Sequence, residues 1–246
     1  MIPYCGVAPP PGTLWGRFNL DPALAMILVA LAFAHCRIIT ARPDIRSVRP
    51  LAVLGWAVVA VALMSPLCAL SVSLFSARVA QHTVLMLLAA PLIAIALPGK
   101  GRELPLKTCG LFFMTMLWFW HMPVPYAATF SSTGVYWCMH ITLFAAATLL
   151  WHALLHHHPG RTITAFVVAT FTSMQMGILG ALLAFADRPL FSAHILTAPA
   201  WGLTPLQDQQ LGGLILWVPG MLVFLWISLR SLRQVGGAFK YAQAVR

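Results

Sequence analysis

The sequence predicts an all-α membrane protein, a bundle of seven transmembrane helices with its N-terminus outside and its C-terminus in the cytoplasm. Three observations predict this fold class. The chain has 246 residues, of which 60% are hydrophobic and only 8% are charged, whereas a soluble domain carries about 25% charged residues. Long apolar stretches divide the chain, and the basic residues between them collect on alternate loops. A surface so poor in charge must face lipid.

The membrane helices follow from stretch length, because a bilayer core needs roughly 20 apolar residues of helix to cross it. The stretches are apolar on every face, unlike the alternating segments of about ten residues that build a barrel. The predicted spans are Leu20–Thr40, Pro50–Ser71, Ala77–Leu97, Leu106–Met122, Val135–His156, Ile163–Ala186 and Leu211–Leu232. The fourth is the shortest. Residues 1–19 are then an external segment, 20–234 the transmembrane domain and 235–246 a cytoplasmic tail.

The basic residues set the orientation, because loops rich in Lys and Arg remain in the cytoplasm. Of the 15 Lys and Arg residues, all but Arg17, Arg78 and Arg188 fall on one side of the predicted bundle. The residues assigned to this cytoplasmic side are Arg37, Arg42, Arg46, Arg49, Lys100, Arg102, Lys107, Arg161, Arg230, Arg233, Lys240 and Arg246. The net charge of +10 therefore indicates orientation in a bacterial inner membrane and no nucleic-acid partner.

The N-terminus and the cysteines lack two common signals. Residues 1–22 contain no charged stretch followed by an apolar core, so we expect no cleavable signal peptide. The five cysteines form no CxxC pair and show no regular spacing, so we expect neither a disulfide framework nor a thioredoxin-like centre. These cysteines are Cys5, Cys36, Cys68, Cys109 and Cys138.

Histidines lie near the outer ends of three predicted helices. His82 lies in the first turns of the third helix, with Met86 four residues later and on the same face. His121 closes the fourth helix, and His140 lies in the outer part of the fifth. Other polar or sulfur-bearing side chains predicted at the same depth are Met64, Cys68, Cys138, Asp208 and Gln209. Polar residues in the hydrocarbon region are costly and face the bundle interior, so these groups are expected to converge.

The donor types favour copper. Imidazole, thioether and thiol ligands together suit Cu(I), whereas hard cations require carboxylates and the chain has only five acidic residues. Tetrahedral zinc is an alternative. Taken singly, each of these side chains is typical of helix packing or of a helix–helix hydrogen bond. Their common depth favours a shared Cu(I) site of His82, His121 and His140 with Met86.

The remaining histidines and motifs give weaker indications of function than the three outer histidines do. His35 and His152, near the inner ends of two helices, are either interfacial or a haem-ligating pair. The run His156–His158 is typical of an interfacial helix end, or of an adventitious metal site. The sequence contains no Gly-rich phosphate loop and no HExxH motif, and the serines form no recognisable catalytic constellation. We therefore expect no enzyme.

Several motifs, taken in order, are similar to those of the CtaG-type (caa3-type) cytochrome c oxidase assembly factors. The most informative is Ser76–Met86 (SARVAQHTVLM), which contains Gln81 and His82. The others are Ser65–Leu67, Ala90–Leu92, Trp120–Pro123, Trp137–Trp151 with His140, Asp208–Gly213 (DQQLGG) and Trp217–Gly220 (WVPG). The resemblance covers Met64 to Gly220.

The resemblance implies a membrane factor that supplies copper to the oxidase catalytic subunit, with that subunit and a periplasmic copper donor as partners. The family's imidazoles fall on His82, His121 and His140, and its acidic–amide pair on Asp208 and Gln209. The family commonly has His-Met where this chain has Arg78-Val79, so one potential ligand is missing. The alternatives are a haem- or quinone-binding redox protein and a metal-free assembly scaffold.

Overall fold

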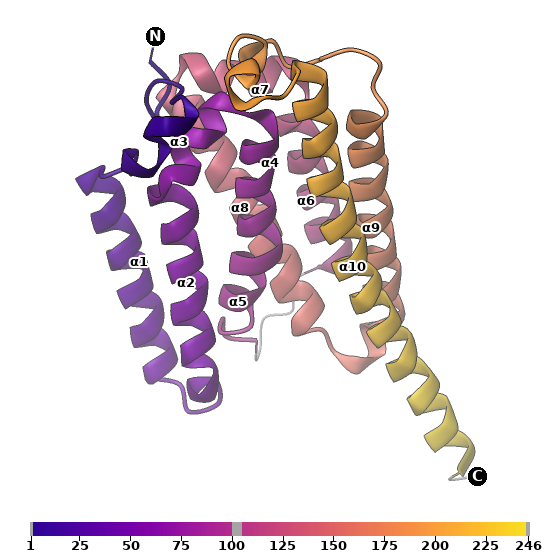
Figure 1. Ribbon diagram of the computed structural model, residues 1–246. Helices are drawn as coiled ribbons and strands as arrows, with labels where there is room; N and C mark the ends of the chain where they lie inside the picture. The colour runs from indigo at the N-terminus through magenta and orange to yellow at the C-terminus, as the bar shows by residue number, and fades with distance from the viewer. Residues whose placement is uncertain (1, 100–104, 245–246) are drawn as a thin grey trace.

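The computed structural model describes residues 2–99 and 105–244, with side chains as far as Arg233. Within these residues the fold is all helical and contains no strand (Figure 1). Lys100, Arg102 and Arg246, which entered the charge distribution, lie outside the described residues, as does the side chain of Lys240.

The principal helices run roughly parallel and form one bundle (Figure 1). They are α1 (Pro22–Thr40), α2 (Arg49–Met64), α4 (Phe75–Val84), α5 (Ala90–Ala94), α6 (Leu106–Trp120), α8 (Thr133–Leu155), α9 (Thr162–Ala184) and α10 (Pro205–Ala244). A π-helical segment, η3 (Leu85–Ala89), joins α4 to α5. Two short helices, α3 (Pro66–Ser73) and α7 (Pro123–Ser131), lie at the end of the bundle that carries the N-terminus, called here the upper end. Single 3₁₀ turns complete the fold: η1 (Pro11–Gly16), η2 (Arg46–Val48), η4 (Pro159–Arg161), η5 (Ser192–His194) and η6 (Ala198–Trp201).

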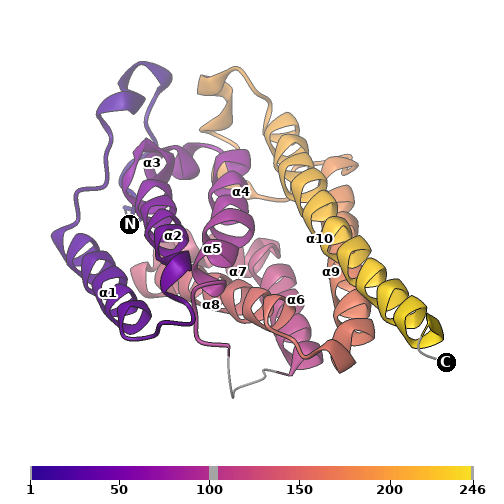
Figure 2. The same ribbon diagram turned by 90° about the horizontal axis from the view of Figure 1, so that it is seen from below.

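Six helical stretches of the described chain are long and apolar enough to cross a membrane. Helix α6 is apolar but has only 15 residues, a length of about 22 Å at 1.5 Å per residue. It nevertheless packs beside α8 and α9 and ends near α7 at the upper end (Figure 1). Seen from below, α1 and α2 lie at one edge of the bundle and α9 and α10 at the opposite edge (Figure 2).

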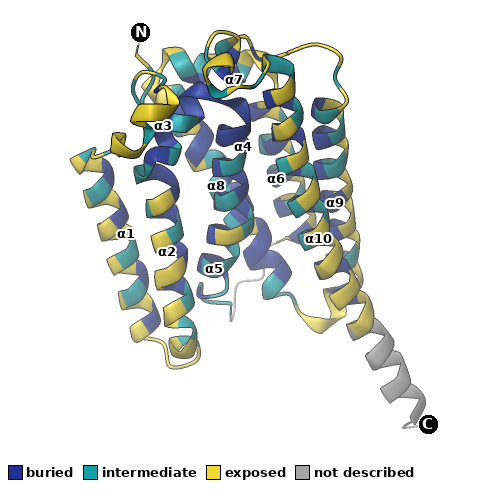
Figure 3. Ribbon diagram, viewed as in Figure 1, coloured by how far each residue is buried: buried dark blue, intermediate teal, exposed yellow. Residues whose placement is uncertain are grey.

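The outer faces of the helices are apolar. Helix α1 exposes Met26, Val29 and Phe33, each more than half accessible, while its Leu24 and Leu28 are buried. The same division into exposed and buried faces recurs along α9 and α10 (Figure 3). Since exposed apolar surface on this scale is stable only against lipid, the chain is a multi-pass membrane protein.

The second predicted span, Pro50–Ser71, is interrupted in the structure. Helix α2 ends at Met64, and Ser65 is extended (φ −75°, ψ 173°) because residues before proline avoid helical geometry. The Ser65 hydroxyl accepts the Leu67 N–H and begins α3, with Pro66 in its first turn. Hydropathy could not show this break, since both sides are apolar.

The π-helical segment in the third span has a local cause. The Ala90 N–H bonds to the Leu85 carbonyl, so the Met86 carbonyl would next receive the N–H of residue 91. That residue is proline and has no N–H. The indole of Trp151 on α8 donates to the Met86 carbonyl instead (2.8 Å). The buried Trp151 indole thus satisfies the hydrogen-bonding capacity of the Met86 carbonyl and holds α8 against this segment.

The expectation of no disulfide was wrong. Cys5 and Cys68 are 63 residues apart and form a disulfide, with their Cα atoms 5.4 Å apart. It ties the N-terminal segment to α3 at the upper end of the bundle. Spacing alone gave no indication of this pair, because the contact depends on how the N-terminal segment folds back over α3.

Candidate functional site

Three histidines from three helical elements meet inside the upper half of the bundle. His82 lies on α4, His121 directly follows α6, and His140 lies on α8. The His82 ring centroid is 5.8 Å from that of His121 and 5.2 Å from that of His140. All three side chains are buried. The structure therefore brings together the three imidazoles singled out in the sequence.

Backbone contacts set the tautomers of two of these rings. His121 Nδ1 lies 2.7 Å from the Leu117 carbonyl, and His140 Nδ1 lies 3.0 Å from the Tyr136 carbonyl. A carbonyl can only accept a hydrogen bond, so the proton of each neutral ring is assigned to Nδ1. Each Nε2 is then left with a free lone pair, which is the form that binds metals.

Three nitrogens in this cluster have no hydrogen-bond partner. They are both ring nitrogens of His82 and Nε2 of His121. Burying an unsatisfied polar atom costs roughly 1–3 kcal/mol, and such atoms are uncommon in folded proteins. Two of the three atoms belong to His82, whose ring neighbours both other imidazoles.

Gln81 links α2 to the imidazole cluster. Its Nε2 donates to the Ala62 carbonyl (2.7 Å), which fixes the orientation of the amide. Its Oε1 consequently faces His140 Nε2 at 3.5 Å. This contact is a hydrogen bond when the His140 proton is on Nε2, and two acceptors face each other when it is on Nδ1.

The donor atoms that converge here are imidazole nitrogens. Among the described residues, no three His, Cys, Asp or Glu side chains are arranged around a metal position. Two imidazoles that share one ion at about 2.0 Å per bond have ring centres roughly 5–6 Å apart, depending on the angle at the ion, and the His82–His121 and His82–His140 spacings of 5.8 Å and 5.2 Å lie in this range. Met86 is fully buried one turn after His82.

The comparisons identify the family of the chain. The model of the cytochrome c oxidase caa3 assembly factor family (Caa3_CtaG) matches residues 33–106 and 105–235, most of the chain. The chain belongs to the Caa3_CtaG family. This membership confirms the resemblance seen in the motifs and implies a role in cytochrome c oxidase assembly, with the oxidase as partner. No curated protein and no solved structure matches the chain.

Arg78 lies on α4, within the Ser76–Met86 motif. Its side chain is fully buried one turn before His82. Neutral groups hold it: Nε donates to the Ser71 carbonyl (3.2 Å), Nη1 donates to the Thr129 hydroxyl (2.7 Å), and the guanidinium lies 4.2 Å from the Phe130 ring centroid. Such cation–π contacts strengthen when desolvated. A permanent positive charge therefore lies close to the imidazole cluster.

Asp208 and Gln209 hold neighbouring backbone segments in position. The Asp208 carboxylate accepts the backbone N–H groups of Phe75 (2.7 Å) and Ser76 (3.0 Å) and the Ser76 hydroxyl. It thus caps the first turn of α4, where the helix dipole favours a negative charge. Gln209 accepts the Leu190 N–H (2.6 Å). The structure places both on the backbone of neighbouring segments instead of on the imidazoles.

The three remaining sulfur-bearing candidates lie apart from this arrangement. Cys68 is bound in the disulfide with Cys5 and is not a free thiolate ligand. Cys138 is exposed on the lipid-facing side of α8. Met64 packs with the apolar cluster between α1 and α2. The sequence placed them by depth, but depth does not determine which face of a helix a side chain occupies.

The inner histidines contact backbone. His35 Nε2 lies 3.2 Å from the Ala96 carbonyl, and the Trp56 indole donates to His35 Nδ1 (3.1 Å). His152 Nδ1 lies 3.5 Å from the Ala94 carbonyl. These rings therefore contact the lower end of the α5 segment, and both ring nitrogens of His35 are hydrogen-bonded.

Two aromatic residues at the site were missed from the sequence. The Tyr136 ring stacks on His140 with centroids 4.3 Å apart. The Tyr126 hydroxyl bonds to Nε2 of His194 (2.7 Å), which brings the outer loop onto α7. Burial and the nearby Arg78 charge lower the pKa of His194 to about 3. The four-residue spacing from Tyr136 to His140 was the available signal, since it puts both on one helix face.

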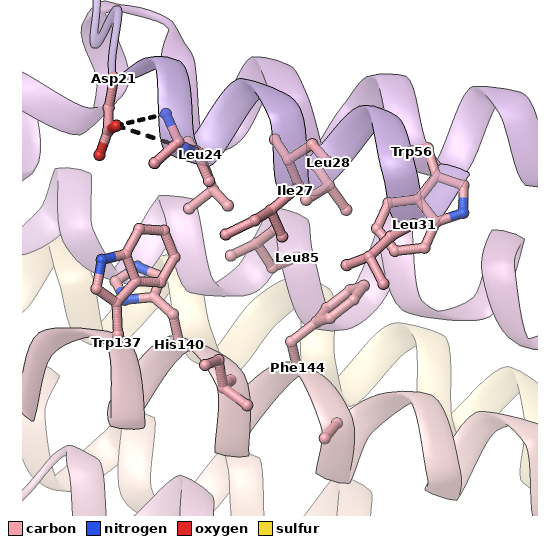
Figure 4. A pocket seen from close by; sticks show the side chains of 15 residues that line it. Asp21, Leu24, Ile27, Leu28, Leu31, Trp56, Leu85, Trp137, His140 and Phe144 are labelled. Atoms are coloured by element: carbon pink, nitrogen blue, oxygen red, sulfur yellow. Dashed lines mark hydrogen bonds between the residues drawn. The ribbon is translucent and has the colours of Figure 1, made fainter. Parts of the chain in front are cut away.

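An apolar groove reaches the imidazole cluster from the side. Its volume is about 560 Å³, and it lies between α1, α2 and α8. Leu24, Ile27 and Leu31 form one wall, with Trp137 and His140 across from them (Figure 4). His140 thus belongs both to the cluster and to the wall of this groove.

Proposed function

We propose that this Caa3_CtaG member is a non-enzymatic assembly factor that binds Cu(I) at His82, His121 and His140 and delivers it to the catalytic subunit of cytochrome c oxidase. The observation that carries this proposal is the convergence of three buried imidazoles whose ring nitrogens include three without a partner. Neutral imidazoles and a thioether are soft donors that suit Cu(I). The copper is cargo and is released to the partner.

The proposed topology is seven spans, with the N-terminus on the periplasmic side of the bacterial inner membrane. Two observations support it: α6 packs beside α8 and α9, and the loops that carry Arg42, Arg46 and Arg161 lie at the end of the bundle opposite the N-terminus. The imidazole cluster then lies just beneath the periplasmic surface, where a periplasmic donor can reach it.

The surroundings of the cluster favour release over storage. Arg78 lies one turn from His82, and its charge opposes a bound cation. The groove beside His140 lies between α1, α2 and α8. A membrane-embedded oxidase subunit that docks along this side would meet His140 without exposing the ion to water.

Cu(I) titration of the purified protein tests the site. We expect about one Cu(I) per chain in competition with bicinchoninate under anaerobic conditions, because neighbouring imidazoles form a single soft-donor site. His82→Leu or His140→Leu should abolish this binding. His82→Leu should leave the protein folded, since its nitrogens bond to nothing in the structure. Unchanged copper stoichiometry in both variants would refute the site.

His157→Asn is the matched control, because this half-buried histidine bonds only to a carbonyl near its own helix end. It should bind as much Cu(I) as the wild type. In cells that lack the gene, wild-type protein should restore copper in the oxidase and His82→Leu should not. Full rescue by His82→Leu would instead support a metal-free scaffold.

A further inference from the structure

The Cys5–Cys68 disulfide lies directly above the imidazole cluster, separated from it by one side chain. The Tyr136 hydroxyl is 3.3 Å from Cys5 Sγ and 3.8 Å from Cys68 Sγ. The ring of the same tyrosine stacks on His140 at 4.3 Å, and His140 in turn neighbours His82 at 5.2 Å. The two sulfur atoms therefore lie at the Tyr136 hydroxyl, and His140 packs against the ring of the same tyrosine.

Polar hydrogens point at these sulfur atoms. Because a disulfide sulfur has no hydrogen, the Tyr136 hydroxyl is the donor in both contacts. The Asn19 amide also donates to Cys68 Sγ, at 3.7 Å. Donors of this kind stabilise a thiolate once the disulfide is opened. The surroundings thus suit the reduced, charged form of the pair as well as the oxidised one.

Contacts other than the disulfide also hold the N-terminal segment in place. The Tyr4 ring packs against Tyr136 and Trp137, with centroid distances of 4.9 Å and 5.0 Å. The Tyr4 hydroxyl donates to the Asp21 carboxylate (2.5 Å). Opening the disulfide would therefore leave Cys5 beside Cys68 and not release it into solvent.

We propose that Cys5 and Cys68, when reduced, form a second Cu(I) site that receives copper ahead of the imidazole cluster. An external dithiol supplies two electrons and two protons, the S–S bond breaks to give two thiols, and the dithiol becomes its own disulfide. Cu(I) then displaces the two thiol protons and binds between the thiolates, with no change in its oxidation state. Soft thiolates select Cu(I).

This arrangement makes copper uptake depend on thiol redox state. A disulfide carries no negative charge and offers no thiolate, so the oxidised protein keeps only the imidazole site. The two-sulfur site stands on the Cys5, Cys68 and Tyr136 geometry alone. Only its place on the route to His140 rests on the proposed function.

The test compares Cu(I) binding by oxidised and reduced protein. The full-length chain is reduced with a phosphine, desalted anaerobically and titrated with Cu(I) against bicinchoninate. We expect reduced wild type to bind one Cu(I) more than oxidised wild type. Cys5→Ser should lose this increment, because it removes one of the two thiolates that would hold the copper. Cys138→Ser, which alters an exposed free cysteine, should keep it.

The His82→Leu variant separates the two sites. It should retain the reduction-dependent increment while lacking the copper bound by oxidised protein, and X-ray absorption of its copper should show sulfur ligands. Equal binding by oxidised and reduced wild type would overturn the two-sulfur site, as would an increment that survives Cys5→Ser. If oxidised wild type binds no copper but the reduction-dependent increment is present, the proposed imidazole site is wrong and the two-sulfur site stands.

Discussion

At the residue scale, the candidate site is defined by atoms that lack partners. His82 is buried among side chains, yet neither of its ring nitrogens makes a hydrogen bond. Each such atom destabilises the protein by roughly 1–3 kcal/mol. A cation at the proposed site would remove the penalty of the one His82 nitrogen that it binds, so the proposed Cu(I) binding would raise the stability of the protein.

Asp208 is the residue for which the structure most changes the interpretation of the sequence. Asp208→Asn should lower stability by about 1–3 kcal/mol, because its new amide group would face the Phe75 N–H, a donor against a donor. Thermal unfolding in detergent, followed by thiol-reactive fluorescence, would show a lower Tm. The exposed Asp187, changed to Asn, is the control and should leave the Tm unchanged.

The same variant separates a structural role from a ligand role. At a temperature where it is folded, Asp208→Asn should bind as much Cu(I) as the wild type, because its carboxylate contacts α4 backbone and not the imidazoles. An unaltered Tm together with lost copper binding would mean that Asp208 is a ligand after all.

At the element scale, α9 and α10 approach closely because glycines face each other. A Cβ on Gly180 would lie 2.6 Å from Trp217 Cβ and 2.7 Å from the Gly213 carbonyl. These neighbours belong to or adjoin the backbone and cannot move without separating the helices. Small residues at such a crossing are typical of membrane bundles, where close packing replaces the hydrophobic effect as the driving force.

Gly180→Ala should therefore destabilise the protein by about 1–3 kcal/mol through overpacking. One turn earlier, a Cβ on Gly177 would meet only Trp217 Nε1, at 3.4 Å, an ordinary contact. Gly177→Ala should be neutral or stabilising, since alanine is favoured over glycine in a helix by up to about 1 kcal/mol. Tm values for the two variants that are equal within error would contradict this account of the helix pair.

The sequence predicted the spans because the position of a membrane helix depends mainly on composition. Val135–His156, for example, corresponds to Thr133–Leu155 in the structure. Composition does not show features that depend on a single backbone atom, such as the extended Ser65 or the Met86 carbonyl freed by Pro91. It also does not reveal contacts between distant segments.

In the candidate site too, some features could be predicted from local sequence and others could not. The common depth of His82, His121 and His140 could be read from helix positions, and the structure brings them together. The roles of Asp208 and Cys68 could not be read, because each depends on a partner more than 60 residues away, as the Cys5–Cys68 separation of 63 residues illustrates. Local patterns carry no information about such pairs.

At the scale of the whole molecule, polar interactions are concentrated at the upper end of the bundle. There the disulfide, Arg78, the Asp208 cap and the imidazoles lie within neighbouring elements. In the described lower end, histidines bond mainly to nearby groups, as His35 does to the Ala96 carbonyl and the Trp56 indole. This asymmetry fits a protein that works at one membrane face and uses the other for anchoring.

The topology depends on α6, because its 15 residues fall short of the roughly 20 that usually span a bilayer. If α6 crosses, Ser132 lies on the side opposite Asp44 and Gly160; if it does not, every later loop changes sides. Alkaline phosphatase fused after Ser132 or Arg188 should be active, and green fluorescent protein fused after Asp44 or Gly160 should fluoresce. Fluorescence from green fluorescent protein fused after Ser132, with no phosphatase activity at the same position, would exclude α6 as a span.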